Sequence, residues 1–196
     1  IGAGEHLDWV ALTRCVPALQ QLPAHVEYYA TPVKLVNPSG VIVDLLKPSA
    51  TPLRDLPQGM CLPHPGLFHR SALFAGQKYD AACRIAGDYD FLCRTLRANN
   101  VAWGDTAFAS MLSGGVSGSM DSMYLSELEL LRVSRKYFPQ RLPYKPLLRL
   151  VRSGGYLAVR RVFGSRIAGF YADIPRLAQG KSRLWSLPDT TDHVAL

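Results

Sequence analysis

The stretch VKLVNPSGVIVDLL (residues 33–46) carries the clearest structural signal of the chain. Two runs of aliphatic and β-branched residues flank Asn-Pro-Ser-Gly, a combination typical of a tight turn, and this pattern predicts a β-hairpin. Just before it, HVEYYA (25–30) alternates and is rich in strand-forming residues. Further upstream, LDWVALTRCVPALQ (7–20) repeats apolar residues with a helical period, although Pro17 predicts an irregular last turn.

Downstream of the hairpin, strand and helix signals alternate. Residues 48–59 contain three prolines and predict a loop with one helical turn, and residues 66–74 mix both signals. A helix is predicted over 89–98, with Asp88 as its N-cap. Residues 101–112 form a strand candidate that a Gly-Asp pair interrupts. Strands mixed with helices over the first 118 residues predict an α/β architecture.

The overall composition is that of an ordinary globular protein. The chain has 196 residues, of which 48% are hydrophobic and 19% charged, so wholesale disorder is excluded. No apolar run approaches the ~18 residues that a membrane-spanning helix needs. The four cysteines are widely scattered and form no CxxC pair, which favours buried free thiols over a zinc site.

Charge is distributed unevenly along the chain. Residues 1–131 carry 9 Lys and Arg residues against 12 acids, whereas residues 132–183 carry 13 against the single acid Asp173. A flexible loop is predicted over 113–119 and a helix over 121–138. Beyond them, apolar residues interleave with arginines, which predicts short amphipathic helices broken at a Gly-Gly pair, Gly154 and Gly155.

This basic segment has three interpretations. It could lie on an anionic membrane surface, because apolar helix faces flanked by arginines bind such bilayers. It could instead pack on the body of the protein or on a second subunit, with its arginines solvated. Nucleic-acid binding is the third interpretation, but the segment shows no recognised nucleic-acid-binding fold and no pattern of aromatic and basic residues for base stacking.

The stretch IAGDYDFLCR (85–94) contains the most informative pair of acids. Asp88 suits an N-cap, and Asp90 is spaced four residues from Arg94, so that these two side chains could form an ion pair on one helix face. Asp88 and Asp90 are two residues apart and therefore point in different directions, which means that they cannot both serve one proton. Considered alone, the stretch predicts a capped helix with an ion pair.

The order of several motifs resembles the second half of a family 2 glycosyltransferase with the GT-A fold, of the type that builds bacterial surface polysaccharides. The motifs are GAGE (2–5), MCLPHPGLFHRSALF (60–74), YDAACRIAGDYDFLCRTL (79–96) and SGGVS (113–117). The resemblance covers roughly residues 1–135. It implies a partial GT-A domain over 1–118, a Rossmann-like mixed sheet with flanking helices, followed by a basic helical extension over 119–196. It also implies that the first nucleotide-binding strands lie before Ile1.

The resemblance assigns roles residue by residue. Asp88 matches the catalytic base, with Asp90 and Arg94 as its supports. Glu5 matches the acidic turn that holds a divalent metal, Mg²⁺ or Mn²⁺. Four further residues are expected to line the donor pocket: His64, Gly114, Gly115 and Ser117.

The sequence departs from the family pattern at the metal site. Glu5 is the only acid of GAGE, where the family has two or three, and no metal-binding histidine follows the SGGVS loop. Glu5 could instead be an acid at the start of a helix, His64 a hydrogen-bonded histidine, and the glycine loop an ordinary connection. Histidines 6, 25, 69 and 193 show no partner spacing and are expected at the surface or hydrogen-bonded.

The sequence therefore leads to the hypothesis of a glycosyltransferase, inverting, that moves a sugar from a nucleotide-sugar donor to a glycan or lipid-linked glycan acceptor. Its expected location is cytoplasmic, peripheral on the inner face of the plasma membrane, with no nucleic acid as partner. Two alternatives stay open. One is a degenerate glycosyltransferase-like module that binds or acts as a scaffold without turnover. The other is a membrane-associated interaction protein that acts through its basic segment.

Overall fold

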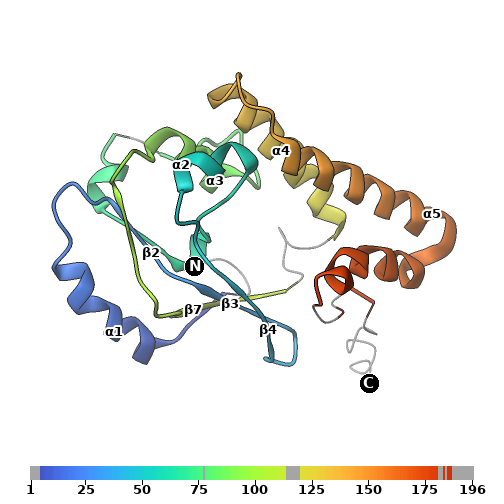
Figure 1. The fold of residues 1–196 in the computed structure, drawn as a ribbon, viewed down its shortest axis with the longest axis horizontal. Helices are drawn as coiled ribbons and strands as arrows, with labels where there is room; N and C mark the ends of the chain where they lie inside the picture. Colours follow the sequence, from blue (N-terminus) through green and yellow to red (C-terminus); the bar gives the residue numbers. More distant parts are fainter. Residues whose placement is uncertain (1–4, 77, 114–119, 181–182, 184, 187–196) are drawn as a thin grey trace.

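The computed structural model describes residues 5–76, 78–113, 120–180, 183, 185 and 186, and it has the mixed α/β architecture that the sequence predicts. Two small sheets and their short helices form the body of the molecule. A pair of long helices lies side by side at the opposite end from the first helix, α1 (Figure 1).

The four-stranded sheet has the order β1-β7-β3-β4. Its strands are β1 (Glu5–Leu7), β7 (Ala109–Leu112), β3 (Val33–Val36) and β4 (Ile42–Leu46). The predicted hairpin is confirmed, since β3 and β4 are antiparallel neighbours and the Asn37 side chain accepts hydrogen bonds from the N–H groups of Ser39 and Val41 in the turn. β7 runs parallel to β3 and antiparallel to β1.

The three-stranded sheet has the order β5-β2-β6, with β5 (Leu67–His69), β2 (Tyr28–Ala30) and β6 (Val101–Trp103). The strand candidate 101–112 is therefore two strands, β6 and β7, which belong to different sheets. Residues 48–59, predicted as a loop with one helical turn, contain α2 (Pro52–Asp55) and η1 (Leu56–Gln58). Two further turns, η2 (His64–Gly66) and η3 (Ser71–Phe74), flank β5.

Helix α1 (Trp9–Gln20) begins two residues later than predicted. Asp8 is its N-cap, accepting a hydrogen bond from the Ala11 N–H at 3.0 Å, so Asp8 has a capping role. The residues before it extend as β1, because their backbone groups pair with β7. The alternative that Glu5 opens a helix is wrong for the same reason.

Helix α3 (Gly87–Thr95) corrects a second expectation. The N-cap is Ala86, and Asp88 lies inside the first turn, one residue past the helix start. The helix ends at Thr95, three residues earlier than predicted. The Thr95 hydroxyl bonds the hydroxyl of Tyr28 on β2, which joins the end of α3 to the second sheet.

The main core lies between α3 and the three-stranded sheet. Tyr89 and Leu92 of α3 are buried there, and the Tyr89 hydroxyl donates to the carbonyl of Leu56 at 2.7 Å. The turn η2 is pressed against the end of β2, since a Cβ on Gly66 would lie 2.5 Å from the Thr31 carbonyl oxygen. This packing fixes His64 at the edge of the core.

Helices α4 (Met120–Tyr137) and α5 (Tyr144–Ala178) form the C-terminal part. α4 confirms the helix predicted over 121–138, but the expected break at Gly154 and Gly155 is wrong. α5 passes straight through both glycines and bends at Gly164, whose φ of 83° is not helical. A Cβ on Gly155 would collide with the Tyr171 hydroxyl. The absence of a side chain at Gly155 therefore allows the part of α5 after the bend to pack against the part before it.

All four cysteines are free thiols, and Cys15 is buried. Within the described ranges, none of the helices combines the length and the apolar character that crossing a bilayer requires.

Candidate functional site

A cleft of about 650 Å³ opens between the first sheet, the start of α3 and the two long helices. β1 and β4 supply one wall, and the segment from η1 to η2 supplies another. The start of α3 and residues from α4 and α5 complete it. Its polar and charged lining residues are Glu5, Asp44, Lys47, Ser49, Asp55, Gln58, His64, Asp88, Ser126, Lys145 and Arg149.

Three residues that the sequence singled out meet in this cleft: Glu5, His64 and Asp88. They come from β1, η2 and α3, and 83 residues separate the first from the last. The charges of Glu5 and His64 both act on the Asp88 carboxyl, so the three side chains share one electrostatic environment. The fold thus brings together two acids and a histidine that the sequence linked only through the resemblance of their motifs to a known family.

The pKa of the Asp88 carboxyl is raised above its usual value. Burial is the main cause, and the nearby Glu5 charge adds to it. His64 and the backbone N–H of Tyr89, which donates to Asp88 Oδ1 at 2.8 Å, act in the opposite direction. A carboxylate with a raised pKa is a stronger base than a free aspartate, which suits proton abstraction from a hydroxyl group.

Asp90 turns away from the cleft, and only 1% of its side chain is exposed. It accepts from Arg94 Nε at 2.8 Å, which is the predicted ion pair, and from the Tyr137 hydroxyl at 3.0 Å. Lys136 Nζ lies 3.5 Å from the same carboxylate. Tyr137 and Lys136 belong to α4, so Asp90 joins α3 to α4 and has no access to a ligand in the cleft.

Glu129 of α4 caps the segment that leads into α3 and not the helix itself, whose N-cap is Ala86. Its carboxylate accepts hydrogen bonds from the N–H groups of Arg84, Ile85 and Ala86 at 3.2, 2.8 and 2.9 Å. Burial would raise the pKa of Glu129, but these N–H groups outweigh it and hold the pKa below its usual value. Because Glu129 binds the segment that leads into the helix, Asp88 is left to face the cleft.

We expect Glu129→Gln to lower the free energy of unfolding by about 1–2 kcal/mol, because a neutral amide oxygen replaces a charged acceptor of three N–H groups. Amide hydrogen exchange at residues 84–86 should become faster. Urea unfolding and exchange measurements would check both effects. Arg135→Gln, which also changes one charge on an exposed part of α4, is the matched control; equal effects of the two variants would contradict the capping role.

His64 lies between the cleft and a cluster of aromatic rings. Its Nε2 is 3.3 Å from the Tyr79 hydroxyl, and its ring centroid is 5.6 Å from that of His69. Burial, helped by the neighbouring His64, lowers the pKa of His69 to about 4, so His69 is neutral at physiological pH. Of these two histidines, His64 lines the cleft and His69 does not.

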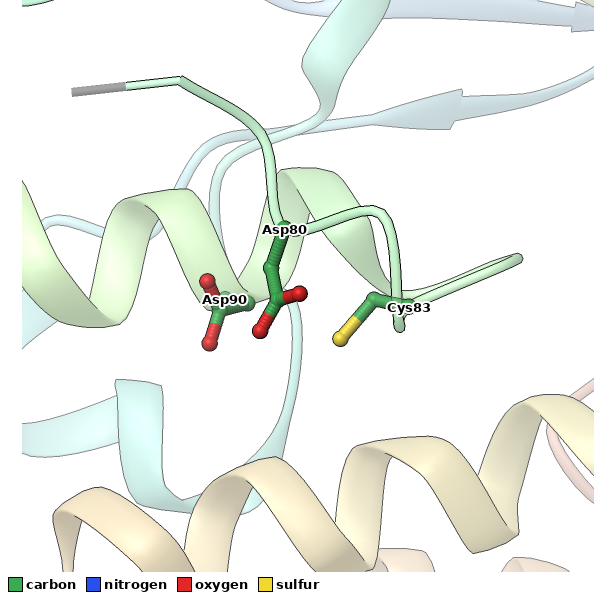
Figure 2. A group of neighbouring side chains, drawn as sticks. All are labelled: Asp80, Cys83 and Asp90. Atoms are coloured by element: carbon green, nitrogen blue, oxygen red, sulfur yellow. The ribbon is translucent and has the colours of Figure 1, made fainter.

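The described residues give Glu5 no set of companion metal ligands. The group of three potential side-chain ligands that they do contain lies elsewhere, at Asp80, Cys83 and Asp90 (Figure 2). There Lys136 Nζ lies 4.0 Å from Asp80 and 3.5 Å from Asp90, so a cation already compensates these acids. Since Mg²⁺ and Mn²⁺ prefer several oxygen ligands, Glu5 alone does not fit a protein-built metal site.

Three basic residues of the cleft were not assigned to it from the sequence: Lys47, and Lys145 and Arg149 of α5. The sequence marked the whole segment as basic but gave no sign of which arginines and lysines turn inward. The predicted pocket residues Gly114, Gly115 and Ser117 lie outside the described residues. The preceding strand β7 reaches the cleft through Met111.

Comparisons with known proteins found no matching family model, curated protein or solved structure.

Proposed function

We propose that this chain is the part of a glycosyltransferase that carries the catalytic base. The proposed reaction transfers a sugar from a nucleotide-sugar to a hydroxyl group of a glycan or lipid-linked glycan, with inversion at the anomeric carbon. The observation that carries the proposal is the meeting of Glu5, His64 and Asp88 in one cleft, with the pKa of Asp88 raised. The motif order that resembles family 2 glycosyltransferases supports the same reaction.

In this reaction Asp88 takes the proton of the acceptor hydroxyl while that oxygen bonds to the anomeric carbon. The bond between the anomeric carbon and the diphosphate oxygen breaks at the same time, and the nucleoside diphosphate leaves with the bonding electrons. Burial raises the pKa of Asp88 and so makes its carboxylate a stronger base for this step. His64, at the same cleft, is placed to orient the acceptor or the diphosphate.

The direct test is to incubate the full-length protein with a panel of nucleotide-sugars and candidate acceptors and to measure release of nucleoside diphosphate. Transfer with inversion, seen in the anomeric configuration of the product, is the expected result. Binding of a nucleotide-sugar without turnover under all conditions would instead support the alternative of a degenerate binding or scaffold module.

We further propose that α5 holds the protein at an anionic membrane surface, on the cytoplasmic face of the plasma membrane. After the bend at Gly164, exposed apolar residues recur at helical spacing, at Ile167, Phe170, Ile174 and Leu177. The opposite side of the same helix is buried, at Ala168 and Ala172. This segment thus presents an exposed apolar stripe, and the guanidinium carbon of Arg183 lies 5.1 Å from the centre of the Phe170 ring.

The charges near the stripe favour an anionic partner. Arg166, next to Ile167 in sequence, is exposed, and so is Arg161, which precedes the bend. The one acid of the basic segment, Asp173, is buried and accepts from the N–H groups of Trp185 and Ser186, so it does not offset these cations at the surface. A bilayer rich in anionic lipid matches both the charge and the apolar stripe.

We expect Arg161→Glu combined with Arg166→Glu to weaken binding to vesicles of anionic lipid by about thirtyfold or more, since each arginine near such a surface contributes about 1 kcal/mol and both charges are reversed. Ile167→Ser should weaken it as well. Co-sedimentation with vesicles that contain phosphatidylserine, compared with vesicles of phosphatidylcholine, measures both effects. Leu142→Ser removes an exposed apolar side chain outside α5 and serves as the control. If Leu142→Ser and Ile167→Ser lowered the affinity for vesicles equally, the apolar stripe would not be the membrane-binding surface.

A further inference from the structure

We propose that Lys145 and Arg149 bind the diphosphate of the donor and stabilise it as it leaves, so that binding needs no divalent metal. The inference rests on the proposed function for the identity of the ligand. It starts from the mismatch at Glu5, whose companion ligands are missing from the described residues. A leaving diphosphate needs nearby positive charge, and side-chain cations can provide it.

Lys145 and Arg149 are placed on the same face of α5. They are four residues apart, both line the cleft, and they face it across from the start of α3. Gln58 holds this end of the helix. Its side-chain oxygen accepts from the Lys145 N–H at 3.2 Å, and its amide donates to the Leu142 carbonyl at 2.9 Å. The first turn of α5 is therefore fixed to the wall of the cleft.

Arg149 is oriented by a buried acid. Its Nε donates to Glu127 Oε1 at 2.6 Å, and the Glu127 side chain is only 6% exposed. The outer part of the guanidinium crosses over Gly59, where an added Cβ would lie 2.9 Å from Nη2. In the described part of the chain, the terminal nitrogens of Arg149 have no hydrogen-bond acceptor, so they remain available to an anion in the cleft.

Charges of both signs line the cleft: the acids Glu5, Asp44, Asp55 and Asp88, and the cations Lys47, Lys145 and Arg149. Asp55 is tied to the Ser49 hydroxyl at 2.7 Å, and this hydrogen bond, together with Arg54, holds the pKa of Asp55 below its usual value despite burial. Lys145 makes no ion pair with any described acid. Lys47 also lines the cleft, but no described contact orients it. Arg149, whose side chain Glu127 orients, and Lys145, whose backbone Gln58 binds, thus place two cations at one end of the cleft, where they can bind two phosphate groups.

The test is calorimetric titration of the full-length protein with inorganic pyrophosphate, once in EDTA and once with Mn²⁺. We expect binding in EDTA, and a loss of affinity of about tenfold or more for Lys145→Glu and for Arg149→Gln. Arg161→Glu, on the same helix but outside the cleft, should bind like the parent protein. Asp88→Asn should bind at least as tightly, because it removes a negative charge from the cleft.

Arg149→Gln leaves the buried Glu127 without its cation and could unfold the chain for that reason. The double variant Glu127→Gln with Arg149→Gln removes both charges, and Lys145→Glu changes an exposed residue, so at least one informative variant should fold. Pyrophosphate binding that requires Mn²⁺, or that Lys145→Glu leaves unchanged, would overturn the inference. Sugar transfer that both cleft variants leave intact would overturn it too, whereas pyrophosphate binding without any transfer would reject the proposed function alone.

Discussion

Asp88→Asn is expected to lower turnover about a thousandfold while leaving the fold intact, within the range that loss of a general base produces. The asparagine is isosteric and keeps the oxygen that accepts from the Tyr89 N–H. It cannot take a proton from the acceptor hydroxyl. The measurement is release of nucleoside diphosphate under saturating donor and acceptor, with circular dichroism as the check on folding.

The pH profile provides an independent readout of the same residue. Asp88 must be ionised to act as a base, so turnover should fall as the pH drops through its pKa. Because burial raises that pKa, the acid limb should lie above the range of an ordinary aspartate. Asp55→Asn, which alters another acid of the cleft, is the control. This variant should have the turnover rate of the parent protein and the same acid limb in its pH profile. Near-normal turnover of Asp88→Asn would refute the assignment.

Asp90→Ala is expected to lower the free energy of unfolding by about 3 kcal/mol. Asp90 is buried and accepts hydrogen bonds from Arg94 and Tyr137, so its removal leaves two donors without an acceptor and separates α3 from α4. The cost stays below that of a fully buried pair because Arg94 is 23% exposed and also donates to the Lys78 carbonyl.

Urea unfolding of Asp90→Ala and Asp80→Ala, followed by circular dichroism, measures this effect against a matched acid. Asp80 contacts the same Lys136 at 4.0 Å, but its side chain is 40% exposed, so its loss should cost well under 1 kcal/mol. If Asp80→Ala were as destabilising as Asp90→Ala, then Asp90 would not be the link between the two helices.

The basic segment combines two proposed roles that can be tested separately. Lys145 and Arg149, near the start of α5, face the cleft, whereas the exposed apolar stripe begins only after the bend at Gly164. Variants of Lys145 and Arg149 should alter pyrophosphate binding without changing vesicle binding. Variants of Arg161, Arg166 and Ile167 should do the reverse.

Much of the local structure followed from the sequence. The hairpin over 33–46 and the helix over 121–138 could be predicted, because a turn sequence and apolar periodicity depend only on near neighbours along the chain. The pairing of Asp90 with Arg94 was predictable for the same reason, since the two residues are one helical turn apart. The α/β character came from the alternation of these local signals.

Errors in the prediction have a common physical cause. Gly154 and Gly155 looked like a helix break, but the first half of α5 packs against α4 and against the returning chain, and these contacts outweigh the weak helix propensity of glycine. Asp88 looked like the N-cap, but the N-cap is Ala86, and the segment before the helix is bound by Glu129, which lies more than 40 residues away in sequence. Contacts between distant segments leave no pattern in the sequence that either segment alone could show.

The sequence by itself thus determined the hairpin, the helix over 121–138 and the mixed architecture, which depend on short-range patterns. The choice of Asp88 as the candidate base came from motif order and stays a prediction. Tertiary structure alone decided that Glu5, His64 and Asp88 share a cleft, that Glu129 leaves Asp88 facing it, and that Lys145 and Arg149 complete it. The reason is physical: burial and electrostatic interaction depend on distances in space, and packing sets those distances.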